Sequence, residues 1–396
     1  MNFFLPLKGL KVLDLTNIIM GPFTTQLLGD LGADIIKIED PDGDITREIG
    51  VQKSSKMSSV YLGVNRNKRS IVLNLKEKKN KEVLWKLIRK SDFFIHNMRP
   101  QKLKKLGFDP KKINKINKKI IFVGLYGYGD NGYYSGQPAF DDIIQGQSGL
   151  ASLSLLKGKK PSFVPSVIAD KSIGLLACSA LLAAHIKMLK TGKGSCIEVS
   201  MFEGMVSYVL LEHQHGEIFY PPMGKAGYPR LLSNNRKPYE TLDGHICILP
   251  YTNKQWFKFF EIIEMEELKK DKRFTSIKSR SKDITILYKL IEKNVKTKTN
   301  HQLCKLLKKN DIPHGVVNNI SYLKNDKHLK KVKFFRKIKH PTEGTLIIPD
   351  TGIKIDKKSL PIKRTQPNLG EHTREILKEL GYKIKEIKKI IDINKK

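Results

Sequence analysis

The chain has few cysteines, no histidine cluster and no long uninterrupted hydrophobic run, and each shortage excludes a class of protein. None of its four cysteines belongs to a Cys-x-x-Cys pair, and their wide spacing suits neither a disulfide framework nor a zinc site. The ten histidines show no ligand spacing, so we predict no metal site. The longest nearly apolar run, residues 173–184, covers about twelve residues, which is too short to cross a bilayer.

The amino-terminal residues lack the pattern of a secretory leader. Residues 1–8 contain no basic segment that precedes a long apolar stretch and a cleavage site. We therefore expect a cytoplasmic protein with free thiols and without membrane association.

Acidic residues are scarce relative to basic ones, and the formal net charge is +34. Such a charge raises the possibility of nucleic-acid binding. Lysine, however, far outnumbers arginine and occurs with Asn and Ile, as in residues 111–119, which is the pattern of an AT-rich coding bias at exposed positions. A surface that reads nucleic acid more often uses arginine with interleaved aromatic residues. We expect no specific nucleic-acid partner and retain nucleic-acid association as the less favoured alternative.

The remaining composition is that of a folded protein, with 40% hydrophobic and 28% charged residues. Residues 11–16 form an apolar strand pattern, Gly21 and Pro22 interrupt it, and 23–31 have apolar residues at helical spacing. Gly32 suits a helix end, and a second strand pattern follows at 34–39. Because short connections favour parallel strands joined by a helix, this segment predicts a βαβ unit.

The alternation of strands and helices continues through the first half of the chain. Further strands are predicted at 71–75, 92–96, 119–124 and 195–200, and helices at 77–89, 171–189 and 201–216. A stretch rich in Pro, Gly and Asn follows at 220–238. A strand-turn-strand pattern at 240–249 and lysine-rich amphipathic helices then predict a smaller α+β domain over 225–325. Beyond it, 344–349 resembles a strand and 371–380 a helix.

Short motifs with a recognisable order and spacing occur along nearly the whole chain. They are Pro6–Thr16, Gly21–Phe23, Leu31–Glu39, Asn65–Ser70, Asn97–Pro100, Gly127–Gly129, Gln145–Gly149, Ile168–Asp170, Tyr239–Gly244 and Gly370–Thr373. In these motifs the chain resembles the class III CoA-transferases, the formyl-CoA transferase or CaiB/BaiF family.

The resemblance implies an α/β fold with a Rossmann-like large domain formed by both chain ends, a smaller inserted α+β domain, and an interlocked homodimer. In this layout residues 1–200 are the amino-terminal part of the large, CoA-binding domain and 201–224 are a linker helix. Residues 225–325 are the small domain, and 326–396 are a return linker and the carboxyl-terminal part of the large domain.

The resemblance also implies a reaction and its residues. CoA moves from an acyl-CoA donor to a carboxylate acceptor through an aspartyl anhydride and an aspartyl-CoA thioester, with a CoA thioester as substrate and no permanently bound cofactor. Asp170 is the implied nucleophile and Asp141 an acidic partner. A carboxylate directly before a long helix is also typical of an N-cap, and the two roles are compatible. The implied CoA contacts are Ile18, Ile19, Met20, Lys68, Asn97, Met98, Arg99 and Lys105.

The sequence departs from related families at three places. α-Methylacyl-CoA racemases share the aspartate but add a histidine in a Gly-His-Asp string, and here Ala139-Phe140-Asp141 stands instead. A racemase-like CoA-ester isomerase is therefore an alternative without its second acid/base group. Residues 220–238 lack the Gly-rich loop that closes over some transferase sites, so the acceptor pocket is expected to differ from that of formyl-CoA transferase. Asp40 replaces a basic residue that follows the Ile-Lys-Ile-Glu string in some members.

Overall fold

The computed structural model describes residues 5–394 and divides into two compact units. The first unit contains the described residues up to Ala151, Phe163–Val209 and the chain from Lys331 onward. The second contains Ser152–Ser162 and Leu210–Lys330. The leader prediction for residues 1–8 falls in part on residues 1–4, which lie outside the described residues, as do 395 and 396.

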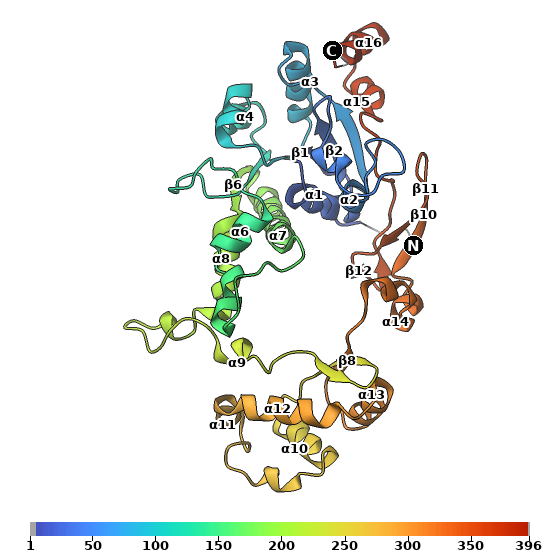
Figure 1. Cartoon of the computed structure of the whole chain (residues 1–396). Coiled ribbons are helices and arrows are strands. Elements are labelled where there is room, and N and C mark those ends of the chain that lie inside the picture. Colours follow the sequence, from blue (N-terminus) through green and yellow to red (C-terminus); the bar gives the residue numbers. More distant parts are fainter. Residues whose placement is uncertain (1–4, 395–396) are drawn as a thin grey trace. The chain divides into compact units, whose positions relative to one another are not determined.

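A six-stranded parallel sheet forms the centre of the first unit (Figure 1). Its strands are β1 (Lys11–Leu15), β2 (Asp34–Glu39), β3 (Lys68–Val72), β4 (Phe93–His96), β5 (Ile121–Tyr126) and β6 (Ser195–Ser200). They lie in the order β3-β2-β1-β4-β5-β6, which is the doubly wound order of dinucleotide-binding folds. The strand order reverses between β1 and β4, and in such sheets ligands bind outside the carboxyl ends of the strands at this reversal.

Helices cover both faces of this sheet, and a separate hydrophobic cluster lies under each layer. One layer contains α1 (Met20–Asp30), α6 (Asp141–Gln147), α7 (Ile168–Thr191) and α8 (Met201–His213). The other contains α3 (Lys78–Arg89), α4 (Pro100–Leu106), α5 (Pro110–Ile116), α15 (Thr373–Glu379) and α16 (Ile384–Ile393). Side chains of α15 and α16 share a cluster with those of α3, beside which they lie in Figure 1. The predicted α/β class with a parallel sheet is confirmed.

Most predicted elements are present, but the third strand begins three residues earlier than expected. The prediction placed it at 71–75, whereas β3 covers Lys68–Val72. The polar string Asn65–Ser70 lay outside the predicted strand. It enters the sheet because its charges are paired inside the protein: Lys68 contacts Asp14 and Arg69 contacts Asp34.

Smaller elements complete the first unit. They are α2 (Ser59–Val64) and the two-stranded sheets β10 (Phe335–His340) with β11 (Gly344–Pro349) and β12 (Lys354–Ile355) with β13 (Lys358–Ser359). Helix α14 (Lys327–Lys331) belongs to the second unit except for its last residue. Short 3₁₀ turns lie at Ile45–Glu48 and, in the second unit, at Ala151–Lys157, His215–Ile218, Glu266–Lys269 and Ile320–Asn325.

The second unit has its own hydrophobic core. An antiparallel sheet of β7 (Tyr239–Thr241), β8 (Gly244–Ile248) and β9 (His314–Val316) packs with α10 (Asn253–Ile262), α12 (Ile284–Val295) and α13 (Asn300–Lys309). The short helices α9 (Pro229–Leu232) and α11 (Ile277–Lys282) belong to the same unit. The predicted strand-turn-strand at 240–249 corresponds to β7 and β8.

Helix α7 corrects one expectation. By length and composition its 24 residues are long and apolar enough to cross a membrane, although the longest uninterrupted apolar run within it is shorter. The helix connects β5 to β6 within the doubly wound fold and packs against α1, α6 and the sheet. We interpret it as a core helix whose outer side is apolar.

Candidate active site

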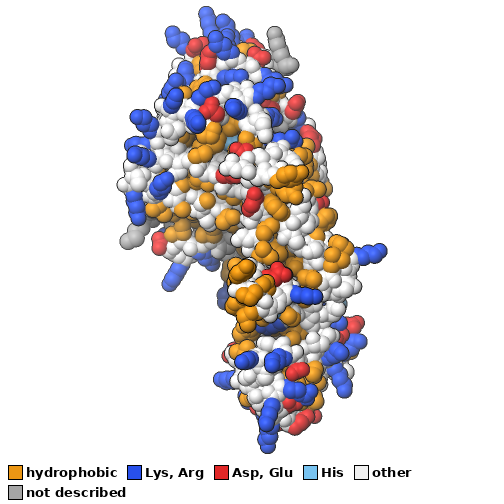
Figure 2. All heavy atoms as spheres, turned by 90° about the vertical axis from the view of Figure 1, so that its left-hand side faces the viewer, with side chains coloured by type: hydrophobic (Ala, Val, Ile, Leu, Met, Phe, Trp, Pro, Cys, Tyr) orange, Lys and Arg blue, Asp and Glu red, His pale blue; other side chains and the backbone are white. Residues whose placement is uncertain are grey.

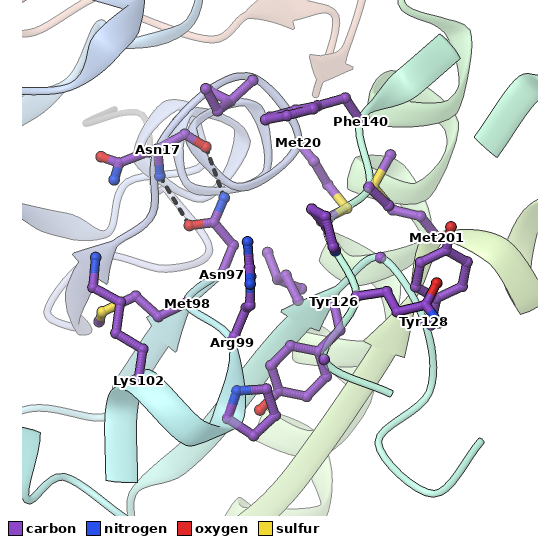
Figure 3. Close-up of a pocket in the computed structure, with 18 of the residues that line it drawn as sticks. Asn17, Met20, Asn97, Met98, Arg99, Lys102, Tyr126, Tyr128, Phe140 and Met201 are labelled. Carbon is purple, nitrogen blue, oxygen red and sulfur yellow. Dashed lines mark hydrogen bonds between the residues drawn. The ribbon is translucent and has the colours of Figure 1, made fainter. Parts of the chain in front are cut away.

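A cavity of about 470 Å³ lies at the carboxyl ends of β1, β4 and β5, where the strand order reverses (Figure 3). Its wall combines the turn after β1, the segment after β4, the loop that follows β5 and the start of α7. The candidate residues Ile18, Met20, Asn97, Met98, Arg99 and Asp170 line this cavity. The fold therefore brings together residues that lie 150 positions apart in the sequence.

The turn after β1 is held in an unusual conformation. Ile18 has φ of 75°, a region that β-branched residues rarely adopt. Two hydrogen bonds secure the preceding residue, because the Asn97 side chain accepts from the Asn17 N–H and donates to the Asn17 carbonyl at 3.0 and 2.8 Å (Figure 3). The Asp44 carboxylate also accepts the Ile18 N–H at 3.2 Å. Strain maintained by several contacts is typical of ligand-binding turns.

Two cations lie on the wall beyond β4. Arg99 is the N-cap of α4 and Lys102 lies in the first turn of that helix, and both line the cavity. Lys105, the predicted cation, lies one helical turn further from the strand end and is not among the described residues of the cavity wall. Ile19, the N-cap of α1, is also outside that wall.

Lys68 lies inside the fold rather than at the cavity surface. Its side chain is fully buried, and its ammonium group donates to Asp14, the Pro22 carbonyl and Asn65 at 2.9–3.0 Å. Burial lowers the pKa of Lys68 to about 8, although the Asp14 carboxylate opposes this shift. The ammonium thus ties β3 to β1 and to the first turn of α1, beneath the segment that faces the cavity.

Asp170 is the third residue of α7, and its side chain does not cap that helix. The helix begins at Ile168 with Val167 at the N-cap position, and no side-chain capping bond is present there. The expected N-cap role is therefore wrong, because the helix starts before the aspartate. Instead the Asp170 carboxylate accepts the backbone N–H of Met20, the first residue of α1. Asp170 is 7% exposed and lines the cavity.

Asp141 supports Asp170 from the adjacent helix. One Asp141 oxygen accepts the Asp170 backbone N–H at 2.9 Å, and the other accepts the Gln145 amide at 2.7 Å. Gln145 also donates to the carbonyls of Val164 and Ser166, which precede α7. This network fixes the start of α7 and hence the nucleophile candidate.

The surroundings of Asp170 favour its protonated form. Burial, and then the negative charge of Asp141, raise the pKa of Asp170 to about 7, and the Met20 N–H opposes them. A carboxylate of this kind is more basic than an exposed one, and once ionised it is a stronger nucleophile.

Several lining residues were not among the site residues predicted from the sequence. Asn17, Lys102, Tyr128, Phe140 and Met201 all line the cavity. Asn17 and Phe140 adjoin motif residues that were identified, so their positions next to a strand end or helix start could have indicated them. Lys102 and Met201 look like an ordinary surface lysine and core methionine until the fold places them. Among the described residues, no group of three or more potential ligands is placed to hold a metal ion.

Comparison with known proteins decides the family. The model of CoA-transferase family III matches residues 7–373. The chain belongs to CoA-transferase family III. It is an enzyme of the transferase class, and its relatives are named for the transfer of CoA between carboxylic acids.

Two curated relatives of this family III enzyme illustrate those names. The succinyl-CoA:glutarate CoA-transferase of Homo sapiens is 30% identical over 387 residues, covering 96% of this chain and 87% of that protein. The formyl-CoA:oxalate CoA-transferase of Bradyrhizobium diazoefficiens is 31% identical over 402 residues, covering 95% and 94%. Among solved structures, a CaiB/BaiF family protein from Brucella suis matches with a TM-score of 0.78 and 29% identity, covering 95% of this chain and 99% of that one.

Proposed function

We propose that this enzyme transfers CoA from an acyl-CoA to a free carboxylate through covalent intermediates on Asp170. The observation that carries the proposal is the placement of Asp170. It is a buried carboxylate in the first turn of α7 that accepts an N–H from the start of α1 and is supported by Asp141. It lies on the wall of a cavity at the sheet's topological switch point. A carboxylate in this position can carry an acyl group and, afterwards, CoA itself.

The reaction consists of two displacements and their reversal. An Asp170 oxygen attacks the acyl-CoA carbonyl carbon, the C–S bond breaks, and CoA leaves as a thiolate to give a mixed anhydride. The thiolate then attacks the aspartyl carbonyl carbon, releasing the first acid as a carboxylate and forming an aspartyl-CoA thioester. The acceptor carboxylate attacks this thioester, and the expelled CoA thiolate attacks the acceptor carbonyl, which frees Asp170. Exclusion of water preserves the activated acyl groups, and burial of Asp170 contributes to it.

In this proposal CoA occupies the part of the cavity that is lined by the segments following β1 and β4. Arg99 and Lys102 are suited to the phosphates because cationic side chains form charge-assisted hydrogen bonds with phosphate oxygens. Ile18, Met20, Asn97 and Met98 form the surrounding wall. Lys68 acts from beneath, by fixing β3 and α1.

Racemisation of a CoA ester has less support from this cavity. It requires an acid or base on each face of the reacting carbon. Histidine is absent from the described residues of the wall, and nearby His96 is fully buried, which lowers its pKa to about 3 and keeps it neutral. Incorporation of deuterium at Cα of a 2-methylacyl-CoA in D₂O distinguishes this reaction, because CoA transfer does not require it.

A homodimer is part of the proposal because the outer side of α7 is apolar. Leu175, Leu176, Ile186 and Leu189 are each about half exposed or more, between 48% and 67%. Figure 2 shows hydrophobic side chains grouped on one face of the protein, between basic residues. Burial of such a surface favours association with a second copy of this chain, and we place the dimer in the cytoplasm.

The direct test measures exchange of CoA between two carboxylic acids by mass spectrometry. Asp170→Asn removes the nucleophile and is expected to lower turnover by roughly 10³-fold or more while the fold persists. Asp142→Asn is the matched control, since Asp142 is exposed on the same helix as Asp141 and should retain near-normal turnover. More than a few per cent of normal turnover in freshly purified Asp170→Asn protein would refute the proposed role.

A further inference from the structure

The two ends of the active-site cavity differ in chemistry. One end, after β4, contains Asn97, Arg99 and Lys102, whereas Met20, Tyr128, Phe140 and Met201 lie on the other side in Figure 3. The second group is apolar apart from the Tyr128 hydroxyl, which is engaged because it donates to Gln147 at 2.6 Å.

Asp170 is connected to the apolar end. Its carboxylate accepts the N–H of Met20, and its partner Asp141 directly follows Phe140 in the chain. In the proposed mechanism the acyl group carried by Asp170 therefore has this apolar side of the same cavity wall beside it. Methionine side chains adapt to apolar groups of irregular shape.

The charges near this end are negative. Asp141 lies against Asp170, and the loop after Tyr128 adds Asp130, which also lines the cavity. Glu198 and Glu203 hold that loop, since they accept the backbone N–H groups of Asp130 and Gly129 at 2.7 and 3.0 Å. The cations among the described wall residues, Arg99 and Lys102, lie after β4, where the proposed function assigns them to CoA phosphates.

From this division of charge we infer that the enzyme handles acyl groups and acceptor acids with an apolar body and a single carboxylate. A short dicarboxylic acid would place its second, unreactive carboxylate near Asp141 and Asp130, on a side where the described wall residues include no cation, and like charges brought together repel. The inference rests on the proposed function and names its substrate class. This substrate class differs from glutarate and oxalate, the dicarboxylates that appear in the names of the relatives.

The test compares two thioesters that differ at one position. Pentanoyl-CoA and glutaryl-CoA have acyl chains of equal length, ending in a methyl group and a carboxylate respectively. Each thioester is assayed with its own labelled acid as acceptor, pentanoate for pentanoyl-CoA and glutarate for glutaryl-CoA. We expect kcat/KM to be at least roughly tenfold higher for pentanoyl-CoA than for glutaryl-CoA. Equal values, or a preference for glutaryl-CoA, would overturn the inference.

Two variants on one loop test the role of the cavity wall. Phe140→Lys introduces a cation at a wall residue that is 63% exposed, and it is expected to shift the ratio toward glutaryl-CoA by roughly tenfold. Tyr133→Lys is the control, because Tyr133 is 94% exposed and outside the described wall, and it should leave the ratio unchanged. If both variants shifted the ratio of kcat/KM values equally, the effect would come from the added positive charge wherever it lies, and the inference would be contradicted.

Failure of the inference and failure of the proposed function give different results. If glutaryl-CoA is preferred and an adduct still forms on Asp170, the substrate class is wrong and the transfer mechanism stands. If neither thioester is turned over and neither modifies Asp170, the proposed function itself fails, and the inference with it.

Discussion

Asp170 lies between two neighbours that act on its proton in opposite directions. Burial, and then the negative charge of Asp141, stabilise the protonated form, and together they outweigh the Met20 N–H, which stabilises the ionised form. The result is a carboxyl group with a pKa of about 7 at a position where an exposed aspartate would be fully ionised at neutral pH. Its reactivity therefore depends on pH in the physiological range.

We predict that kcat/KM for CoA transfer rises as the pH increases through about 7, because only ionised Asp170 attacks the thioester. Asp141→Asn removes a neighbouring negative charge, so the inflection should move to lower pH even if the maximal rate falls. Rate profiles between pH 5.5 and 8.5 measure both effects. A flat profile, or an inflection that moves upward in Asp141→Asn, would contradict this account of the Asp170 pKa.

Stability should show the opposite pH dependence to activity at Asp170. Its folded-state pKa is raised above that of the unfolded chain, so the contribution to stability is complete below pH 4 and is lost as the pH rises toward 7. Asp170→Asn should therefore gain melting temperature relative to the natural chain at pH 8 but not at pH 5. Thermal unfolding at both values provides the comparison, and an equal difference at the two pH values would argue against a raised pKa.

The cations predicted for CoA separate into two roles. Lys68→Met leaves the buried Asp14 carboxylate without its ion-pair partner and should lower the free energy of unfolding by about 3–5 kcal/mol. Arg99→Met should raise KM for acyl-CoA by roughly tenfold or more, without a change in melting temperature, because charged hydrogen bonds contribute about 1.5–3 kcal/mol each. Melting curves and initial rates distinguish the roles, and the reverse pattern would make Lys68 the ligand contact.

At the scale of elements, the turn from β1 into α1 carries the site. Gly21 lies so close to Thr16 that a Cβ atom would overlap its side chain, whereas Gly63 in α2 has no heavy atom within 4 Å of such a Cβ. Gly21→Ala should therefore destabilise the protein by about 1–3 kcal/mol. Gly63→Ala, the control, should be neutral or stabilise by up to about 1 kcal/mol. Chemical denaturation measures both, and a harmless Gly21→Ala would show that the turn tolerates rearrangement.

The sequence predicted the elements whose pattern is local and missed features that depend on pairing across the fold. Strands β2 and β6 were predicted with their observed bounds, because β2 is buried and contains three isoleucines, whereas Ile197 and Val199 alternate with more exposed residues in β6. The predicted start of β3 was three residues too late because Lys68 and Arg69 are charged. Ion pairs with residues distant in the sequence allow them to lie in a buried strand. Lys102 was not predicted, because the sequence does not show which lysine of α4 lies nearer the strand end, and one helical turn separates them by about 5 Å. Lys105 stays a prediction.

At the scale of the whole molecule, the apolar outer side of α7 predicts self-association. Leu175→Glu should shift the chain from twice its mass toward a single copy, because a carboxylate would be buried at the interface. Ile384→Glu is the control, since Ile384 is 83% exposed and lies on α16, outside α7. Light scattering after size-exclusion chromatography gives the masses. A natural chain that is monomeric at micromolar concentration would contradict the proposed homodimer.

The central claim is covalent catalysis by Asp170, and trapping of the intermediate tests it most directly. The enzyme is incubated with an acyl-CoA donor, without acceptor, in the presence of hydroxylamine, and its peptides are analysed by mass spectrometry. Hydroxylamine attacks activated acyl carbons and leaves free carboxylates unchanged, so we predict a hydroxamate at Asp170 in the peptide that contains Ile168–Lys171, and none at Asp142. If donor turnover is demonstrated in the same sample and Asp170 remains unmodified, the double-displacement mechanism is wrong.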